Sequence, residues 1–158
     1  ILSFSVEMNC NFDEFENFTS HLTKLFLIKF PGLTVRLQNN WETQLNNCLS
    51  IKFICNLNLS MLKINDKNAI AIAEALKKNS TLQKLNLKYN EIVHEGASAI
   101  AEALRTNFTL QEIDLNRNQI GDEGAIAIAE ALKTNYTLQN IHLTLNQPSN
   151  ILMNLPSF

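Results

Sequence analysis

The sequence predicts an α/β solenoid, a stack of similar units that each contain one short strand and one helix. Three segments recur at offsets of 28 residues: LQKLNLKYNEI, LQEIDLNRNQI and LQNIHLTLN, which begin at positions 82, 110 and 138. Alanine-rich segments of helical character, such as AIAIAEALKKNST at 69–81, lie between them in the same register. Each period therefore has a strand half and a helix half.

The strand half carries an LxxLxL pattern. Leu85 and Leu87 alternate with polar residues and share one face of a strand, and Leu82 lies three positions before Leu85. Lys84 and Asn86 must then point to the opposite face. We expect the leucine face to be the core.

In the helix half, Ile100, Ala103 and Leu104 recur at helical spacing, whereas Glu102 and Arg105 lie toward solvent. The same pattern in the neighbouring periods lets adjacent helices pack through small and apolar side chains. A single repeat buries too little apolar surface to fold alone, so the repeats must form one cooperative body.

Glycine and asparagine recur at the helix boundaries. Gly96 and Gly124 are expected just before their helices, where the backbone adopts an unusual angle. The asparagines of three Asn-x-Ser/Thr sequons recur at the 28-residue period. We interpret them as helix-ending residues in the left-handed conformation and not as glycosylation sites. They are Asn79, Asn107 and Asn135.

These patterns resemble the leucine-rich repeats of the ribonuclease-inhibitor type, which also form the C-terminal arrays of NOD-like receptors. The consensus LxxLxLxxNxIxxxGAxxIAxAL is matched over about residues 54–146. The resemblance implies a right-handed β/α horseshoe fragment with parallel strands on the concave side and helices on the convex side. It also implies that Asn90, Asn118 and Asn146 bond backbone groups of the neighbouring turn. The first repeat departs from the pattern, because Leu62 occupies the asparagine position.

We divide the chain into a flank at 1–50, a leucine-rich-repeat array at 51–147 with about three 28-residue repeats plus a terminal strand, and a tail at 148–158. Apolar residues three or four apart between Phe12 and Phe26 predict a helix that Pro31-Gly32 ends, so the flank is expected to be a helical cap. A second helix would carry Leu37, Trp41, Leu45 and Cys48.

Two alternatives remain at the ends. Val35, Leu37 and Asn40 also fit the strand half of a degenerate repeat of about 22 residues. At the other end, Pro148 interrupts the fourth repeat. The apolar tail either folds over the open core of the last repeat, or the array was cut there. The chain begins with Ile1, and we expect a piece of a longer protein.

The composition of the chain argues against several functions. The net charge is −2 without a Lys/Arg run, so we expect no nucleic-acid partner, and the longest apolar stretches are too short to cross a membrane. Three cysteines without a CxxC pair favour a reducing compartment and a cytoplasmic location. No P-loop occurs, and His21, His94 and His142 lack metal-ligand spacing. We therefore expect no enzyme, cofactor, metal or small-molecule substrate.

The strand face opposite the leucines remains as the candidate site. Stacked strands bring its polar and aromatic side chains into one surface, in which Tyr89 and Arg117 are of the types most enriched at binding hot spots. We expect the partner-binding residues to be Lys84, Asn86, Lys88, Tyr89, Glu112, Asp114, Asn116, Arg117 and His142.

The predicted function is a non-catalytic interaction module that binds a protein partner on this concave face. The resemblance implies that it is the sensor or autoinhibitory part of a NOD-like receptor. Two alternatives use the same kind of repeat: a GTPase-activating protein of the Ran-activator type, and an actin-regulating leucine-rich-repeat protein. Repeat type alone does not choose among them.

Overall fold

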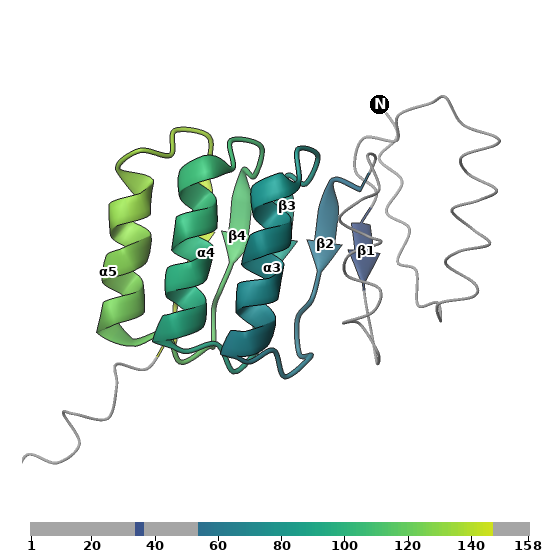
Figure 1. Ribbon diagram of the computed structural model, residues 1–158. Helices are drawn as coiled ribbons and strands as arrows, with labels where there is room; N and C mark the ends of the chain where they lie inside the picture. Colours follow the sequence, from purple (N-terminus) through teal and green to yellow (C-terminus); the bar gives the residue numbers. More distant parts are fainter. Residues whose placement is uncertain (1–33, 37–53, 147–158) are drawn as a thin grey trace, which may run out of the picture.

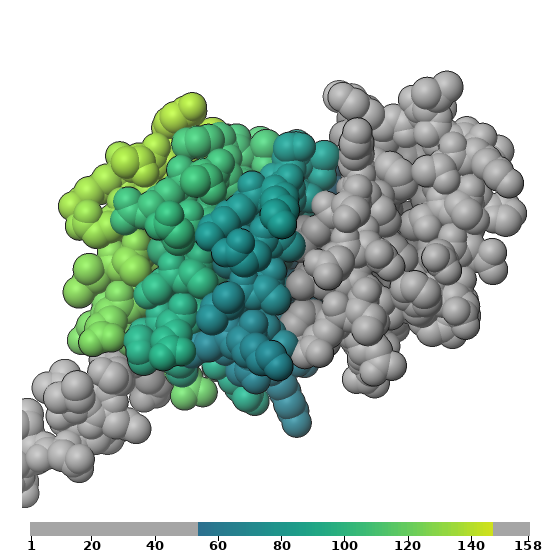
Figure 2. Space-filling view, in the orientation of Figure 1, coloured from purple at the N-terminus to yellow at the C-terminus, as the bar shows by residue number. Residues whose placement is uncertain are grey.

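The computed structural model describes residues 34–36 and 54–146, in which short strands alternate with helices. The strands form one parallel sheet in the order of the chain, and the helices lie side by side over one face of it (Figure 1). Side chains of the helices cover that face as a continuous surface (Figure 2). The elements are β1 (Thr34–Arg36), β2 (Asn56–Asn58), α3 (Asp66–Lys78), β3 (Lys84–Asn86), α4 (His94–Thr106), β4 (Glu112–Asp114), α5 (Gly121–Leu132) and β5 (Asn140–His142).

The register of the sheet follows the 28-residue period from β2 onward. Leu57 pairs with Leu85, Leu85 with Ile113, and Ile113 with Ile141, so equivalent residues of successive repeats lie side by side. Strand β1 pairs with β2 at a shorter offset, Thr34 with Asn56, which is 22 residues. The alternative of a degenerate repeat of about 22 residues predicted a strand at Val35, and β1 is that strand. The sheet therefore begins inside the segment assigned to the flank.

The remaining expectations for the two ends fall outside the described residues. These are the two cap helices and the apolar tail after Pro148.

The core matches the predicted faces. Leu82, Leu85 and Leu87 are at most 2% exposed, and so are Ile100 and Leu104 of α4. Their equivalents in the last repeat, Leu138, Ile141 and Leu143, are only partly buried. The difference follows from position, because the described residues include no further repeat beyond β5 to cover that end.

The asparagine ladder implied by the resemblance is present. The Asn118 side chain donates from Nδ2 to the carbonyl oxygens of Leu87 and Leu115, both at 3.0 Å, and its Oδ1 accepts from the Ile92 N–H at 3.1 Å. Leu87 and Ile92 belong to the preceding repeat, so one buried amide joins two turns of the solenoid. Asn90 and Asn146 make the equivalent bonds.

The sequon asparagines end the helices in a different way from the one predicted. Asn79 and Asn107 follow α3 and α4 with φ of −80° and −92°, so both are extended. The prediction of a left-handed conformation is therefore wrong. Asn107 Oδ1 accepts from the Leu110 N–H, and its Nδ2 donates to Leu76 O at 2.8 Å and Asn79 O at 2.9 Å. Both amide hydrogens are used and Asn107 is 3% exposed, so the folded array leaves no place for a glycan there.

The prediction that Gly96 and Gly124 precede their helices at unusual backbone angles is also wrong. Both lie inside the first turns of α4 and α5, and neither has positive φ. Space is the reason for glycine. A Cβ on Gly96 would lie 2.5 Å from Asp66 Oδ1, and one on Gly124 would lie 2.8 Å from Ala97 Cβ of the neighbouring helix.

Candidate binding surface

The concave side of the sheet brings the predicted partner-binding residues together. Those on β3, β4 and β5 alternate with the buried residues Leu85 and Ile113 and the partly buried Ile141, and the others lie in the turns that follow β3 and β4. The register places Lys84 beside Glu112, and their side chains form an ion pair of 2.7 Å. A pair this exposed contributes little to stability, about 1 kcal/mol at most. It does neutralise the lysine, so Lys84 presents little net charge to a partner.

Two of the predicted binding residues, Asn86 and Asp114, also stabilise turns of the fold. Asn86 Oδ1 accepts from the Lys88 N–H at 3.0 Å, and Asp114 Oδ1 accepts from the Asn116 N–H at 2.9 Å. Asn58 makes the same bond to the Ser60 N–H in the repeat before. These turns fix where the chain leaves each strand, so part of the polar chemistry at these positions serves the fold.

Asn116 and His142 occupy the end of the surface nearest β5. Asn116 Oδ1 accepts from the Thr144 N–H at 2.6 Å and so ties the last two turns together. His142 is exposed and lies beside Asp114 in the register. Its ring remains accessible to a partner.

An aromatic ring in contact with two cations marks the turn after β3. The Lys88 ammonium lies 5.1 Å and the Arg117 guanidinium carbon 4.9 Å from the centre of the Tyr89 ring. Such contacts stabilise by about 0.5 to 1 kcal/mol at exposed sites. The contacts hold an aromatic group close to two positive charges.

Four residues at the same position of successive repeats form a row that we call the ridge: Met61, Tyr89, Arg117 and Leu145. All of them have positive φ, between 54° and 62°. Long side chains are rare in this left-handed conformation, which costs about 1 to 2 kcal/mol per residue. Three are also large exposed hydrophobic residues, with Met61 and Leu145 each 62% exposed. The sequence predicted Tyr89 and Arg117 as surface residues but gave no sign of the backbone strain that all four residues share.

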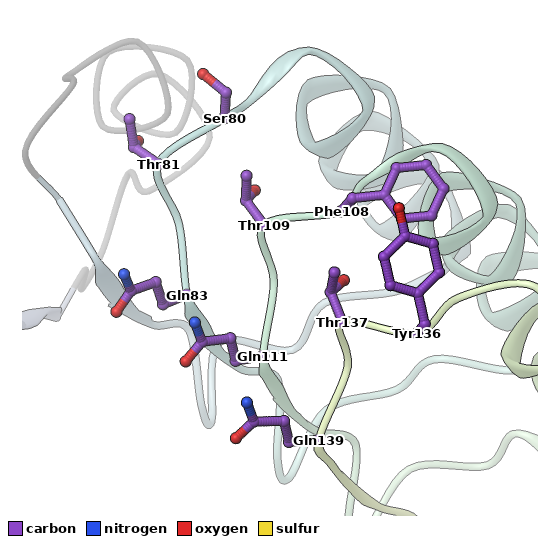
Figure 3. Close-up of a pocket in the computed structure, with 9 residues that line it drawn as sticks. All are labelled: Ser80, Thr81, Gln83, Phe108, Thr109, Gln111, Tyr136, Thr137 and Gln139. Atoms are coloured by element: carbon purple, nitrogen blue, oxygen red, sulfur yellow. The ribbon is translucent and has the colours of Figure 1, made fainter.

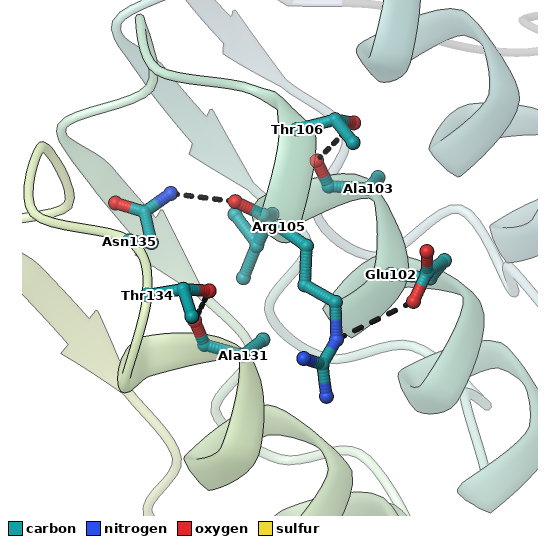
Figure 4. Close-up of polar contacts among 8 residues, drawn as sticks. Glu102, Ala103, Arg105, Thr106, Ala131, Thr134 and Asn135 are labelled. Carbon is teal, nitrogen blue, oxygen red and sulfur yellow. Dashed lines mark hydrogen bonds and ion pairs between the residues drawn. The ribbon is translucent and has the colours of Figure 1, made fainter.

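The carboxylates of the convex helices behave as surface ion pairs. Glu74, Glu102 and Glu130 contact the basic residue three positions later, at 2.7 Å to Lys77, 3.4 Å to Arg105 and 2.5 Å to Lys133. The hydrogen bond and charge of the partner lysine hold the pKa of Glu74 and of Glu130 below the ordinary value. Figure 4 shows the Glu102–Arg105 pair together with the buried sequon asparagine Asn135, whose side chain donates to the Leu104 carbonyl oxygen.

Residues 34–36 and 54–146 contain no metal-binding cluster and no membrane-spanning helix. No group of three or more His, Cys, Asp or Glu side chains lies close enough to hold a metal ion. No helix there is long and apolar enough to cross a membrane. His94 lies 3.9 Å from Glu123 at the surface.

A hollow lies at the opposite edge of the sheet, where the helices end and the next strands begin (Figure 3). Sequence reasoning missed it, because the recurring Thr-Leu-Gln segment was treated only as the start of a strand. In that segment the leucine enters the core while threonine and glutamine face the hollow. The lining residues are Ser80, Thr81, Gln83, Phe108, Thr109, Gln111, Tyr136, Thr137 and Gln139.

The parallel sheet, the helical outer layer and the asparagine ladder define a leucine-rich-repeat protein. The family model described as the TMOD/LMOD leucine-rich domain matches residues 34–150. The chain therefore belongs to the TMOD/LMOD leucine-rich domain family. The comparisons support the leucine-rich-repeat part of the expected resemblance and give no support to its ribonuclease-inhibitor or NOD-like-receptor part.

Two solved structures are similar to the chain. One is described as leiomodin-1 actin-binding site 2, with 31% identity and a TM-score of 0.63, and the match covers 70% of this chain and 66% of that one. The chain thus spans just under two thirds of that structure's length. The other is the tropomodulin C-terminal domain of Caenorhabditis elegans, with 16% identity, a TM-score of 0.61 and coverage of 72% and 74%. At that identity it shows the fold alone. No curated protein sequence matches the chain.

Proposed function

We propose that this chain is an actin-binding module that acts by protein contact and not by catalysis. The observation that carries the proposal is the match to leiomodin-1 actin-binding site 2, at 31% identity over 70% of this chain. Membership of the TMOD/LMOD leucine-rich domain family is consistent with this proposal. Such a role implies a cytoplasmic location.

The ridge and the neighbouring concave face are the surface that we assign to actin. Tyr and Arg dominate binding hot spots, and Tyr89 and Arg117 lie in contact at the centre of the ridge. Because Glu112 neutralises Lys84, Lys88 and Arg117 supply the positive charge of this region, and together they exceed the single remaining carboxylate, Asp114. The surface therefore suits an acidic patch on the partner with an apolar contact beside it.

The receptor and GTPase-activator hypotheses have less support. Both rest on the repeat type, which a binding module of any kind can share. The comparisons instead favour the alternative of an actin-regulating leucine-rich-repeat protein.

Co-sedimentation with filamentous actin and capture of monomeric actin test the proposal. The wild-type chain should bind in at least one format, and Tyr89→Ala and Arg117→Ala should each weaken binding about tenfold or more. Tyr136→Ala is the matched control, because Tyr136 is 83% exposed and lies at the opposite edge of the sheet.

Two results would count against the proposal in different ways. Failure of the wild-type chain to bind either form of actin overturns the function. Normal actin binding by both ridge variants overturns the assignment of the ridge and leaves the function in place.

A further inference from the structure

The outer edge of β5 carries backbone groups without a partner. Asn140 N–H and His142 O both bond residues of the preceding repeat. Successive residues of a strand direct their backbone groups to opposite sides, so the groups of Ile141 and the N–H of Leu143 point away from β4. Within residues 34–36 and 54–146 these groups make no hydrogen bond, although the equivalent Leu115 N–H donates to His142 O at 2.9 Å. Strand β5 is therefore an open edge of the described sheet.

Apolar side chains lie along this edge. Leu138, Ile141 and Leu143 are only partly buried, whereas their equivalents one repeat earlier are 0% exposed. Ile126 of α5 and Leu145 after β5 are each 62% exposed. An edge that combines unpaired backbone groups with apolar neighbours is a template for pairing with another chain.

The outer side of α5 continues the same surface. Figure 1 shows α5 at the outer end of the row of helices. An exposed stripe of this helix begins with Asp122 and ends with Lys133, directly after the last helical residue, and Ala125 and Ala129 lie between them. Residues 122 and 133 are about three turns apart, so the two charges lie on one side of the helix. The stripe is negative at its beginning and positive at its end.

The neighbouring helix shows that this stripe is a packing face. Ala97 and Ala101 of α4 occupy the positions of the two alanines, and they are 0% and 2% exposed because α5 covers them. The approach is close, since a Cβ on Gly124 of α5 would lie 2.8 Å from Ala97 Cβ. Helix α5 turns the same face outward, where no described residue covers it.

We call this surface the end face. It consists of Asp122, Ala125, Ala129, Lys133, Leu138, Ile141 and Leu143.

The end face is complementary to itself under a two-fold axis perpendicular to the sheet. Such an axis sets two copies of β5 antiparallel, with Ile141 opposite Ile141 of the second copy, and each can exchange both backbone hydrogen bonds with the other. The same rotation sets two copies of α5 antiparallel, so Asp122 of each copy faces Lys133 of the other. One operation therefore matches the backbone groups, the apolar side chains and the charges.

The charges also select the direction of the pairing. A parallel pair of α5 helices would place Asp122 against Asp122 and Lys133 against Lys133, and like charges in an interface are unfavourable. The antiparallel pair replaces both repulsions by attractions. The face thus fits its own inverse.

We propose that two copies of this chain form a symmetric dimer through the end face, with β5 joined to β5 and α5 packed on α5. The sheet then runs continuously through both copies. Tyr89 and Arg117 lie outside the end face, so this association goes beyond the proposed binding of actin.

The size of the end face fits a weak, reversible dimer. A 12-residue helix is about 18 Å long, and a helix layer on a sheet layer is about 20 Å deep, so each copy buries about 400 to 500 Å². The total of about 800 to 1,000 Å² lies at the low end for specific complexes. We expect a dissociation constant of about 10 to 100 µM.

Sedimentation velocity of the full 158-residue chain at about 1 to 300 µM tests the dimer. The wild-type chain should shift reversibly from monomer to dimer. Asp122→Lys and Lys133→Asp each set like charges against each other twice per dimer, so each should weaken association about tenfold or more. An equimolar mixture of the two variants should recover wild-type association, because each introduced charge then faces an opposite charge on the other copy.

Lys77→Asp is the matched control. Lys77 occupies the position of Lys133 two repeats earlier and pairs with Glu74 as Lys133 pairs with Glu130. It lies on α3, outside the end face, so its reversal should leave association unchanged. Circular dichroism shows whether each variant is folded.

Three results would overturn the proposal. The first is a wild-type chain that stays monomeric at about 300 µM. In that case, protection of the Ile141 and Leu143 N–H groups from hydrogen exchange would assign the end face to segment 147–158 of the same chain. The second is a mixture of the two variants that associates no more tightly than either variant alone. The third is a loss of association in Lys77→Asp as large as that in Lys133→Asp.

Discussion

Arg117 stacks on Tyr89 across two adjacent repeats, with the guanidinium carbon 4.9 Å from the ring centre. The two residues occupy equivalent positions, and both have left-handed backbones, with φ of 54° and 57°. The shared left-handed conformation directs both side chains along the same edge of the sheet, where they contact each other. The contact therefore depends on the stacking of repeats and not on either repeat alone.

The contact between Tyr89 and Arg117 should be measurable as a coupling in the free energy of unfolding. In a double-mutant cycle of Tyr89→Leu and Arg117→Met, we expect about 0.5 to 1 kcal/mol of coupling in the free energy of unfolding, the range of exposed cation–π contacts. Urea denaturation gives the four values. Tyr89→Leu combined with Arg105→Met on the convex helices should be additive, and equal coupling in both cycles would show that the stack contributes nothing specific.

Relieving the strain at the ridge should stabilise the fold. Met61 has φ of 62° and is 62% exposed, so Met61→Gly removes a left-handed side chain that buries little surface. After the greater unfolded-state entropy of glycine is subtracted, we expect a gain of about 0.5 to 1 kcal/mol. Met61→Val should lose stability instead. A urea midpoint that falls for the glycine variant contradicts the strain argument.

Removal of one ladder amide should be among the most damaging changes. Asn118→Ala leaves Ile92 N–H, Leu87 O and Leu115 O without their side-chain partner in the buried turn. Unsatisfied buried groups cost about 1 to 3 kcal/mol each, so we expect a loss of about 3 to 5 kcal/mol. Gln119→Ala, one residue later on the surface, should stay within about 0.5 kcal/mol of wild type. Similar losses for the two variants would disprove the role of the ladder.

Gly96→Ala should destabilise the chain although it lies in a helix, where alanine is favoured over glycine by about 1 kcal/mol. The added Cβ would approach Asp66 Oδ1 to 2.5 Å and Ala69 Cβ to 2.9 Å. Asp66 Oδ1 accepts from the Val93 and Gly96 N–H groups and so caps α4 from the preceding repeat. We expect a loss of about 1 to 3 kcal/mol in thermal or urea unfolding. Ser98→Ala, exposed on the same helix, should not destabilise.

The pKa of Glu74 should depend on Lys77. The Lys77 hydrogen bond lowers that pKa, so the carboxyl should titrate below the ordinary glutamate value of about 4.3. A lowered folded pKa means that the ion pair stabilises the fold above the unfolded pKa and that this contribution is lost as pH falls through the folded pKa. Carbon-13 NMR titration of the Glu74 carboxyl should show a rise toward the ordinary value in Lys77→Met. No change between the two chains would exclude the pair as the cause.

The local pattern was enough to predict the repeat. The 28-residue recurrence determines the register, and the LxxLxL spacing identifies Leu82, Leu85 and Leu87 as core, which their burial confirms. The predicted surface residues also lie on one side of the sheet. Periodicity is a property of neighbouring positions along the chain, and it therefore specifies strands, helices and faces without reference to the rest of the molecule.

What only the tertiary structure decided concerns contacts between repeats. Gly96 was expected because of an unusual backbone angle, but glycine is needed there because Asp66 and Ala69 approach closely. Asn107 was expected to be left-handed, but its side chain bonds carbonyl groups of the preceding turn. The Thr-Leu-Gln segments likewise gave no sign of a hollow until three of them were stacked. Each of these features joins residues about 28 apart in the chain that lie only a few ångströms apart in space. Their energetics depend on the distance across the stack, which the order of residues in one repeat does not contain.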